Sequence, residues 1–150
     1  MPAISFSVFL HQLIERTKRQ TIRLTHRLRV GDITTNYWKA RLSIQRKREL
    51  GVPHFLGVSV IEDIESMTIT SMDDRIAKLD GFNSFEELKE YLVSKYENKL
   101  DKQFFTTEFT VNRFRWLHEF KEEWKYFKSQ DVKRIIFEHN KNRLFLQMLL

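Results

Sequence analysis

The sequence contains no cysteine, and this absence excludes several kinds of chemistry. A chain without cysteine has no disulfide, no thiol nucleophile and no thiolate ligand for zinc. The lack of disulfides favours an intracellular, cytoplasmic protein. The histidines are scattered without metal-ligand spacing, so we expect no metal site; they are His11, His26, His54, His118 and His139.

Glycine and long apolar runs are also scarce. The four glycines form no phosphate-binding loop, so nucleotide hydrolysis is not indicated and we expect no cofactor. No stretch approaches the roughly 18 apolar residues of a membrane-spanning helix. The segment from Ile4 to Leu13 is interrupted by polar residues, which argues against a signal peptide. We therefore expect no membrane partner.

Charge is abundant but unevenly distributed over the 150 residues, which have a formal net charge of +6. Residues 1–54 contain 11 Lys and Arg against 3 Asp and Glu. Residues 55–111 contain 6 against 12, and residues 112–150 contain 9 against 5. If the two basic ends meet in the fold, they form a cationic face of the kind that binds nucleic acids. The alternative is that these cations only keep the protein in solution.

The hydrophobic pattern predicts one α+β domain. Alternating or β-branched segments predict strands at 3–7, 21–24, 33–45, 55–72 and 104–116. A short helix is expected at 8–16 and one or two helical turns at 73–79. Ser84 and Glu87 form a capping box that predicts a helix to about Asn98. Residues 46–53 are expected to be a basic loop.

The last part of the chain differs from the rest in its mixture of aromatic and basic residues. We predict a domain at 1–116 and an extension at 117–150, because so short a segment cannot easily form a core alone. Asp131 is expected to begin a helix through His139. The extension is predicted to pack on the domain or on a partner.

A set of motifs combines cations, a hydroxyl group and a carboxylate. Residues 18–23 read Lys-Arg-Gln-Thr-Ile-Arg, Gly31-Asp32 follows, and Asp80-Gly81-Phe82 comes much later. Asp80 is expected to return to the first motif. Thr21 and Arg23 point to one face of a strand, where the Arg23 guanidinium can hold a phosphate or carboxylate. The alternative is structural, with Arg23 paired to an acid such as Asp32 or Asp80.

The order and spacing of these motifs resemble the ASCH family of PUA-like β-barrels. In that family Lys-x-x-Thr-x-Arg follows the first helix, Gly-Asp comes next, and Asp-Gly-Phe precedes a helix that starts Ser-x-Glu-Glu. The resemblance covers roughly residues 4–115 and implies a small PUA-like barrel with flanking helices, here followed by a basic and aromatic extension. Many members have a glycine just before the lysine, where this chain has the bulkier Glu15-Arg16-Thr17.

The resemblance implies a pocket at Lys18, Thr21 and Arg23 that holds a base or phosphate of RNA, which is the function we favour. A ribosome or another ribonucleoprotein is a suitable setting. A related enzyme branch hydrolyses N4-acetylcytidine with a lysine, a threonine and a glutamate. Lys18 and Thr21 match the first two, while Asp80 replaces the glutamate and is one methylene shorter. In this amidohydrolase alternative, neutral Lys18 takes a proton from Thr21 or water, and Asp80 passes it on. If Asp80 lies close to Lys18, it instead keeps Lys18 charged, and Lys18 then serves to bind an anion.

Other basic and aromatic residues extend the predicted RNA surface. Tyr37 and Trp38 lie between two basic segments and can stack on unpaired bases, worth roughly 1–3 kcal/mol each, which favours single-stranded or structured RNA over a duplex. The alternative is that both rings belong to the core. The extension contacts RNA as well, or binds a protein. The predicted phosphate contacts are Lys18, Arg19, Arg23, Arg27, Arg29, Arg46, Lys47, Arg48, Arg113 and Arg115.

Overall fold

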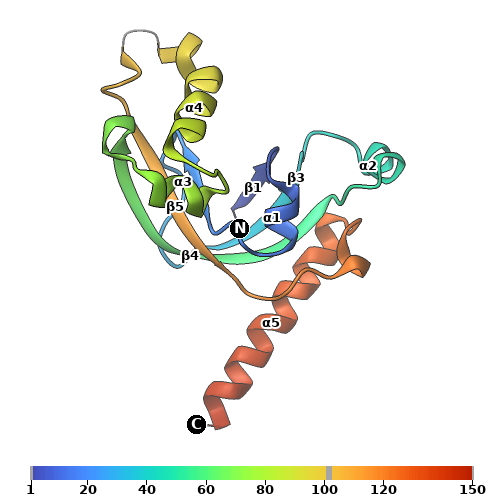
Figure 1. The fold of residues 1–150 in the computed structure, drawn as a ribbon. Coiled ribbons are helices and arrows are strands. Elements are labelled where there is room, and N and C mark those ends of the chain that lie inside the picture. Colours follow the sequence, from blue (N-terminus) through green and yellow to red (C-terminus); the bar gives the residue numbers. More distant parts are fainter. Residues whose placement is uncertain (1, 101–102, 150) are drawn as a thin grey trace.

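The computed structural model describes residues 2–100 and 103–149 and has a mixed α+β fold, as predicted (Figure 1). Its described strands form one five-stranded sheet in the order β1-β3-β4-β5-β2. The strands are β1 (Ala3–Phe6), β2 (Gln20–Arg23), β3 (Ile33–Trp38), β4 (Phe55–Thr68) and β5 (Glu108–Trp116). The α-helices are α1 (Leu10–Ile14), α2 (Ile44–Leu50), α3 (Asp74–Asp80), α4 (Phe85–Leu100) and α5 (Ser129–Leu149). Two short 3-10 helices, η1 and η3, lie at Ile69–Ser71 and Glu122–Trp124.

The long strand β4 organises the sheet. It pairs with β3 and with β5, both antiparallel, while β1 is parallel to β3. The register between β4 and β5 shifts between Ile61 and Asp63, which leaves Glu62 as an extra residue. Such a bulge bends a strand and increases its twist. Figure 1 shows β4 curving around the sheet, so that the outer strands β1 and β2 approach each other.

Side chains, not strand pairing, connect β2 and its following loop to β1. The Arg23 Nη2 donates to the Ser5 carbonyl at 2.9 Å, and the Arg27 Nη2 donates to the Ala3 carbonyl at 2.7 Å. These contacts satisfy two carbonyls on an edge strand, which would otherwise be open to another chain. Arg23 and Arg27 therefore bridge the two outer strands of the curved sheet, which gives it the shape of a barrel without strand pairing at the seam.

Three clusters of buried apolar residues form the core. One packs α3 and α4 on the sheet through residues such as Ile76, Leu92 and Phe109. A second packs α1 on the barrel through Leu13 and Phe114. The third joins the extension to the sheet; its buried members are Phe55, Val58, Val132 and Ile136.

Several predicted strands are shorter than expected, and the predicted loop at 46–53 was wrong. The strand at 33–45 ends at Trp38, and the expected basic loop at 46–53 contains α2. Ser43 begins this helix by accepting a hydrogen bond from the Arg46 N–H at 3.1 Å, and Gly51 ends it at φ 70°. The strand at 55–72 ends at Thr68. The strand at 104–116 starts at Glu108.

The predicted helical turns at 73–79 and the predicted helix start at Ser84 are confirmed. Asp73 begins α3 by accepting from the Ile76 N–H at 3.0 Å. Ser84 accepts from the Glu87 N–H at 3.3 Å. The Glu87 carboxylate, however, accepts from the Asn83 N–H rather than from that of Ser84.

Within residues 2–100 and 103–149, no helix is long and apolar enough to cross a membrane.

Candidate functional site

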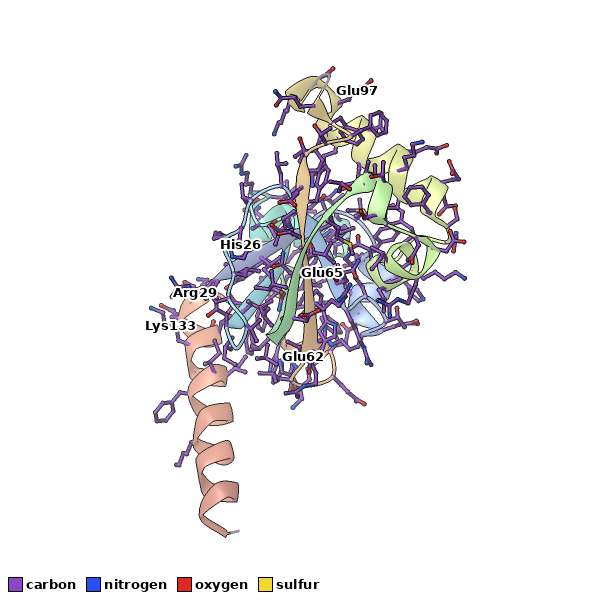
Figure 2. The ribbon with its side chains drawn as sticks, turned by 90° about the vertical axis from the view of Figure 1, so that its left-hand side faces the viewer. His26, Arg29, Glu62, Glu65, Glu97 and Lys133 are labelled. Carbon is purple, nitrogen blue, oxygen red and sulfur yellow. The ribbon has the colours of Figure 1, made fainter. Side chains whose placement is uncertain are left out.

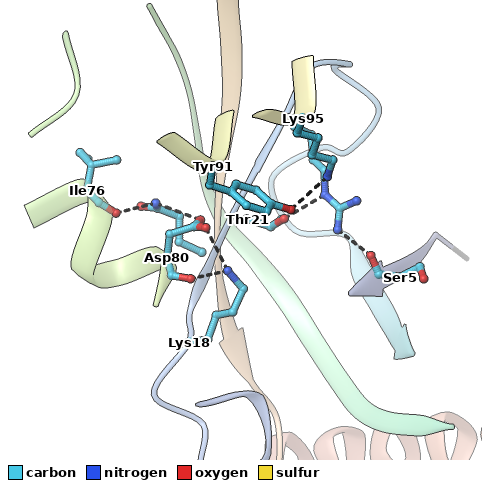
Figure 3. A network of polar contacts seen from close by, with 9 residues as sticks. Ser5, Lys18, Thr21, Ile76, Asp80, Tyr91 and Lys95 are labelled. Carbon is cyan, nitrogen blue, oxygen red and sulfur yellow. Dashed lines mark hydrogen bonds and ion pairs between the residues drawn. The ribbon is translucent and has the colours of Figure 1, made fainter. Parts of the chain in front are cut away.

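The predicted return of Asp80 to the first motif is confirmed. Lys18, just before β2, and Asp80, at the end of α3, form a buried ion pair with 3.1 Å between Nζ and Oδ2 (Figure 3). The same ammonium also donates to the Asp80 backbone carbonyl. Gln20 Nε2 donates to Asp80 Oδ1 at 3.3 Å and to the Ile76 carbonyl at 3.0 Å. Both donors to the carboxylate thus come from β2 or the residues just before it, and Gln20 is itself fixed by the Ile76 carbonyl of α3.

The Asp-Gly-Phe motif shapes one wall of this site. Gly81 ends α3 at φ 111°, in the left-handed region that favours glycine. A Cβ at Gly81 would lie 3.0 Å from the Phe9 ring, so the position also needs to be small. Phe9 packs edge-on against Phe82, with the ring centroids 4.7 Å apart. The motif thus brings an aromatic wall to within 5.4 Å of the Lys18 ammonium.

Two opposing effects act on the charge of Lys18, and the lowering of its pKa prevails. Burial lowers the pKa of Lys18, and the charge and hydrogen bond of Asp80 oppose that shift. Among the described residues, both hydrogen bonds of the ammonium go to Asp80. The Thr21 hydroxyl instead accepts from Arg23 Nε at 2.9 Å. The proton path of the amidohydrolase alternative is therefore not formed in this arrangement.

The cavity beside the ion pair is small. It has a volume of about 40 Å³ and is bordered by Lys18, Thr21, Arg23, Asp80 and Tyr91. Burial is the main cause that raises the pKa of Tyr91, with the Asp80 charge adding to it. One water molecule occupies about 30 Å³ in the liquid, so this cavity has room for water and not for a base.

A second cavity of about 270 Å³ lies beside the first, and Thr21 and Arg23 border both. Arg27 and Asn112 also line it. Thr21 and Asn112 face each other in register on β2 and β5. The buried Asn112 Oδ1 has no hydrogen-bond partner among the described residues. The residues that border this cavity thus include two arginines, a threonine and Asn112, whose amide oxygen is buried without a partner among the described residues.

Arg23 has the structural role of the second alternative, but its partners are not the predicted acids. It ties the barrel together, but through the Ser5 carbonyl and the Thr21 hydroxyl rather than through Asp32 or Asp80. Burial lowers the pKa of its guanidinium. Asp32 has a different role, accepting from the backbone N–H of Arg29 at 2.9 Å and so fixing the Gly31-Asp32 turn.

The structure divides the other predicted phosphate contacts into two groups. Arg113 pairs with Asp63 and Glu65 at 2.7 and 3.0 Å, and Arg115 pairs with Glu62 at 2.8 Å. Figure 2 shows Glu62 and Glu65 along β4, away from the loop that carries His26 and Arg29. The C-terminal basic segment is thus partly neutralised by the acidic middle of the chain. The remaining predicted arginines are exposed, although Arg46 pairs with Glu49 at 3.0 Å: Arg19, Arg27, Arg29, Arg46 and Arg48.

Two of the predicted RNA contacts outside the Lys18–Asp80 site have buried side chains, which favours a structural role for them. Lys47 is fully buried, with Nζ 2.7 Å from His54 Nδ1. Trp38 belongs to the core with only 8% of its surface exposed. Tyr37 is partly buried and packs against His54 and Phe55, so the core alternative also describes it better.

Asn112 is the main feature of the site that sequence reasoning missed. A polar residue between Val111 and Phe114 on a strand was the available signal. Its meaning depends on which face of β5 borders the cavity, which the pattern alone does not give.

In the described part of the chain, no group of three or more potential metal-ligating side chains comes together.

Comparison with known proteins supports the fold. No protein-family model matches the sequence, and no curated protein matches it significantly. The ASCH domain from Lactobacillus crispatus JV V101 aligns with a TM-score of 0.56 at 10% identity, over 77% of this chain and 79% of that one. A protein of the DUF984 family from Enterococcus faecalis V583 aligns with a TM-score of 0.57 at 10% identity, over 78% and 80%. The protein therefore has an ASCH-like fold, as the motifs predicted.

Proposed function

We propose that the protein binds single-stranded or looped RNA and holds an unpaired base in the cavity between Thr21, Arg23 and Asn112. The unpartnered amide of Asn112 carries this proposal. A buried polar atom without a hydrogen bond costs roughly 1–3 kcal/mol, so its presence calls for a reason. Binding a ligand with matching donors is such a reason, and RNA-binding proteins read splayed bases through their edges.

The cationic groups around the cavity suit the rest of a nucleotide. Arg27 is exposed at the cavity and can approach a phosphate, while Arg23 is fixed at its wall. The volume of about 270 Å³ lies near the lower end of ligand sites, which suits one base rather than a larger molecule. The exposed arginines at 19, 29, 46 and 48 are candidates for further phosphates, in a ribonucleoprotein setting.

Replacement of Asn112 by leucine separates this function from folding. Asn112→Leu removes an amide with no partner, so the free energy of unfolding should change by less than about 1 kcal/mol or increase. The affinity for a fluorescent single-stranded RNA, measured by anisotropy, should fall by about fivefold or more, because one base contact is worth roughly 1–3 kcal/mol.

Asn36→Leu is the matched control. The buried Asn36 Nδ2 donates to the Gly57 carbonyl at 3.1 Å and to Ser59 Oγ at 3.0 Å. This variant should lose stability while its folded fraction keeps the wild-type RNA affinity. Unchanged RNA affinity in Asn112→Leu would exclude the cavity as the base site.

Release of cytidine from N4-acetylcytidine by the wild type, abolished by Lys18→Ala, would instead support the amidohydrolase alternative.

A further inference from the structure

A third cavity lies outside the site described above, between the end of α1 and the segment that follows β5. We call it the α1–tail groove. Its volume of about 750 Å³ falls within the range of roughly 300–1,000 Å³ that is usual for ligand sites. The lining residues that matter here are Arg16, Arg19, Arg115, Trp116, Glu119 and Phe120.

Arg16 is held in this groove by an unusual local backbone. Its φ is 67°, in the left-handed region that disfavours side chains other than glycine. Its Nε donates to the His118 carbonyl at 3.2 Å and its Nη1 to the Leu13 carbonyl at 3.0 Å. The guanidinium carbon lies 3.8 Å from the centre of the Trp116 ring. These contacts fix a planar cation at the groove.

Gly57 on β4 provides the space for this arrangement. A Cβ at Gly57 would lie 2.6 Å from Arg16 Nη2, so any side chain there would displace the guanidinium. Gly57 itself has a φ of 133°. Two special backbone positions, one on each side, therefore accommodate the same cation. Strained residues that persist in a fold often mark functional positions.

The groove is lined by three arginines and three glutamates, which are only partly paired with one another or with neighbours. Arg115 pairs with Glu62 and Glu122 with Lys125, while Glu15 contacts His11, whose ring is charged only when protonated. Within the described residues, Arg16 and Arg19 have no carboxylate at ion-pair distance, and Arg16 Nη2 is buried without a hydrogen-bond partner. Among the described residues, Glu15 and Glu119 are the groove carboxylates without a lysine or arginine partner. Burial lowers the pKa of Arg16 to about 10, so it stays charged at neutral pH.

We propose that the α1–tail groove binds one unpaired nucleotide of RNA. The base stacks on the Phe120 ring, and the phosphate contacts Arg19, with Arg16 as a second, fixed positive charge. Only Nε of Arg19 has a hydrogen bond in the described structure, to the Arg16 carbonyl, so its terminal nitrogens are available. The Phe120 ring lies 5.8 Å from the Arg16 guanidinium carbon, so the stacking surface and the charge border one space.

This second nucleotide site rests on the proposed RNA binding, and one experiment tests both. Single-stranded RNA containing 4-thiouridine is crosslinked to the full chain, and the crosslinked peptides are identified by mass spectrometry. Peptides that contain residues 115–122 are expected. Phe120→Leu, which keeps an apolar side chain but removes the aromatic face, and Arg19→Gln should each weaken binding by about fivefold or more.

Arg75→Gln on α3 is the control for removing one exposed positive charge, and it should weaken binding by less than about twofold. If the RNA crosslinks only elsewhere and both groove variants bind like the wild type, the groove proposal is overturned while RNA binding stands. If the wild type binds no RNA, both proposals fail.

Discussion

At the scale of single residues, Arg16 and Lys47 are two of the cations that are withdrawn from solvent without a carboxylate partner in the described structure. Arg16 is held by backbone carbonyls and the Trp116 ring. Lys47 is fully buried against His54 Nδ1. Sequence analysis placed Lys47 among the phosphate contacts because its neighbours Arg46 and Arg48 are basic. A run of basic residues shows that a segment is cationic but not which way each side chain points. The helix α2 turns the side chain of Lys47 toward the interior.

The Lys47–His54 contact makes stability depend on pH. Burial, together with the Lys47 charge, lowers the pKa of His54 from its ordinary value of 6.5 to about 4. Between these values the unfolded chain binds a proton that the folded chain does not, so stability falls as the pH falls from about 6.5 to about 4. Because His54 is partly exposed to solvent, we expect a loss of about 1–2 kcal/mol, less than the full 1.36 kcal/mol per pKa unit.

Urea unfolding at about pH 7 and about pH 4.5 measures this loss. His54→Asn keeps a side-chain oxygen that can accept from Lys47 but does not titrate. The difference in free energy of unfolding between the two pH values should therefore be smaller in this variant than in the wild type. An equal difference in both proteins would show that His54 is not the titrating group.

The site residues show where sequence reasoning works and where it stops. The return of Asp80 to the first motif was predictable from the order of the motifs, but the contact between Lys18 and Asp80 was not. The roles of Arg23 and Asn112 were not predictable, because they depend on how β1, β2 and β5 approach across the barrel. The Ser5 carbonyl that binds Arg23 is a backbone atom and leaves no signal in the sequence.

At the scale of elements, α2 is the clearest failure of sequence reasoning. The segment before it is rich in β-branched and aromatic residues, which extended the predicted strand too far. The helix has only seven residues, too few for an amphipathic period to stand out. The signals that were present are the N-cap Ser43 and the C-terminal Gly51, and these local contacts define the helix.

Removal of the Ser43 cap tests the importance of these contacts. Ser43→Ala should lower the free energy of unfolding by about 1 kcal/mol, because the Arg46 N–H loses its acceptor. Ser43→Asp keeps an acceptor at the helix N-terminus and should retain most of the stability. Chemical denaturation of the three proteins measures the effect. Equal losses in both variants would mean that the cap contact does not stabilise α2.

At the scale of the whole molecule, the extension at 117–150 contributes to the core. The backbone N–H groups of His54 and Phe55 both donate to the Lys125 carbonyl, at 2.6 and 2.9 Å. Val132 and Ile136 on α5 are buried against the sheet, and Figure 1 shows the rest of the helix extending away from it. The expected boundary at 117 marks a change in composition and not an end of packing.

Two adjacent residues of α5 test this packing. Ile136 is 5% exposed and Phe137 is 68% exposed. In the full chain, Ile136→Ala should lower the free energy of unfolding by about 2–4 kcal/mol, whereas Phe137→Ala should change it by less than about 0.5 kcal/mol. Chemical denaturation gives both values. Similar effects of the two substitutions would contradict the packing of α5 on the sheet.

Charge also has to be considered for the whole molecule. The distribution of charge along the chain suggested one cationic face formed by the two basic ends, but Arg113 and Arg115 pair with the acidic part of β4. The exposed arginines of the N-terminal half therefore dominate the proposed RNA surface. This pairing follows from the register of β4 and β5 and was not visible in the sequence.

The salt dependence of RNA binding tests the central proposal most directly. Anisotropy titrations of a labelled single-stranded RNA at about 50 and 200 mM salt give two dissociation constants. If about three phosphates are neutralised, the slope of about −0.7 per phosphate predicts a loss of affinity of about twentyfold. No measurable binding at low salt, or an affinity that does not change with salt, would contradict the proposal that this ASCH-like protein holds RNA.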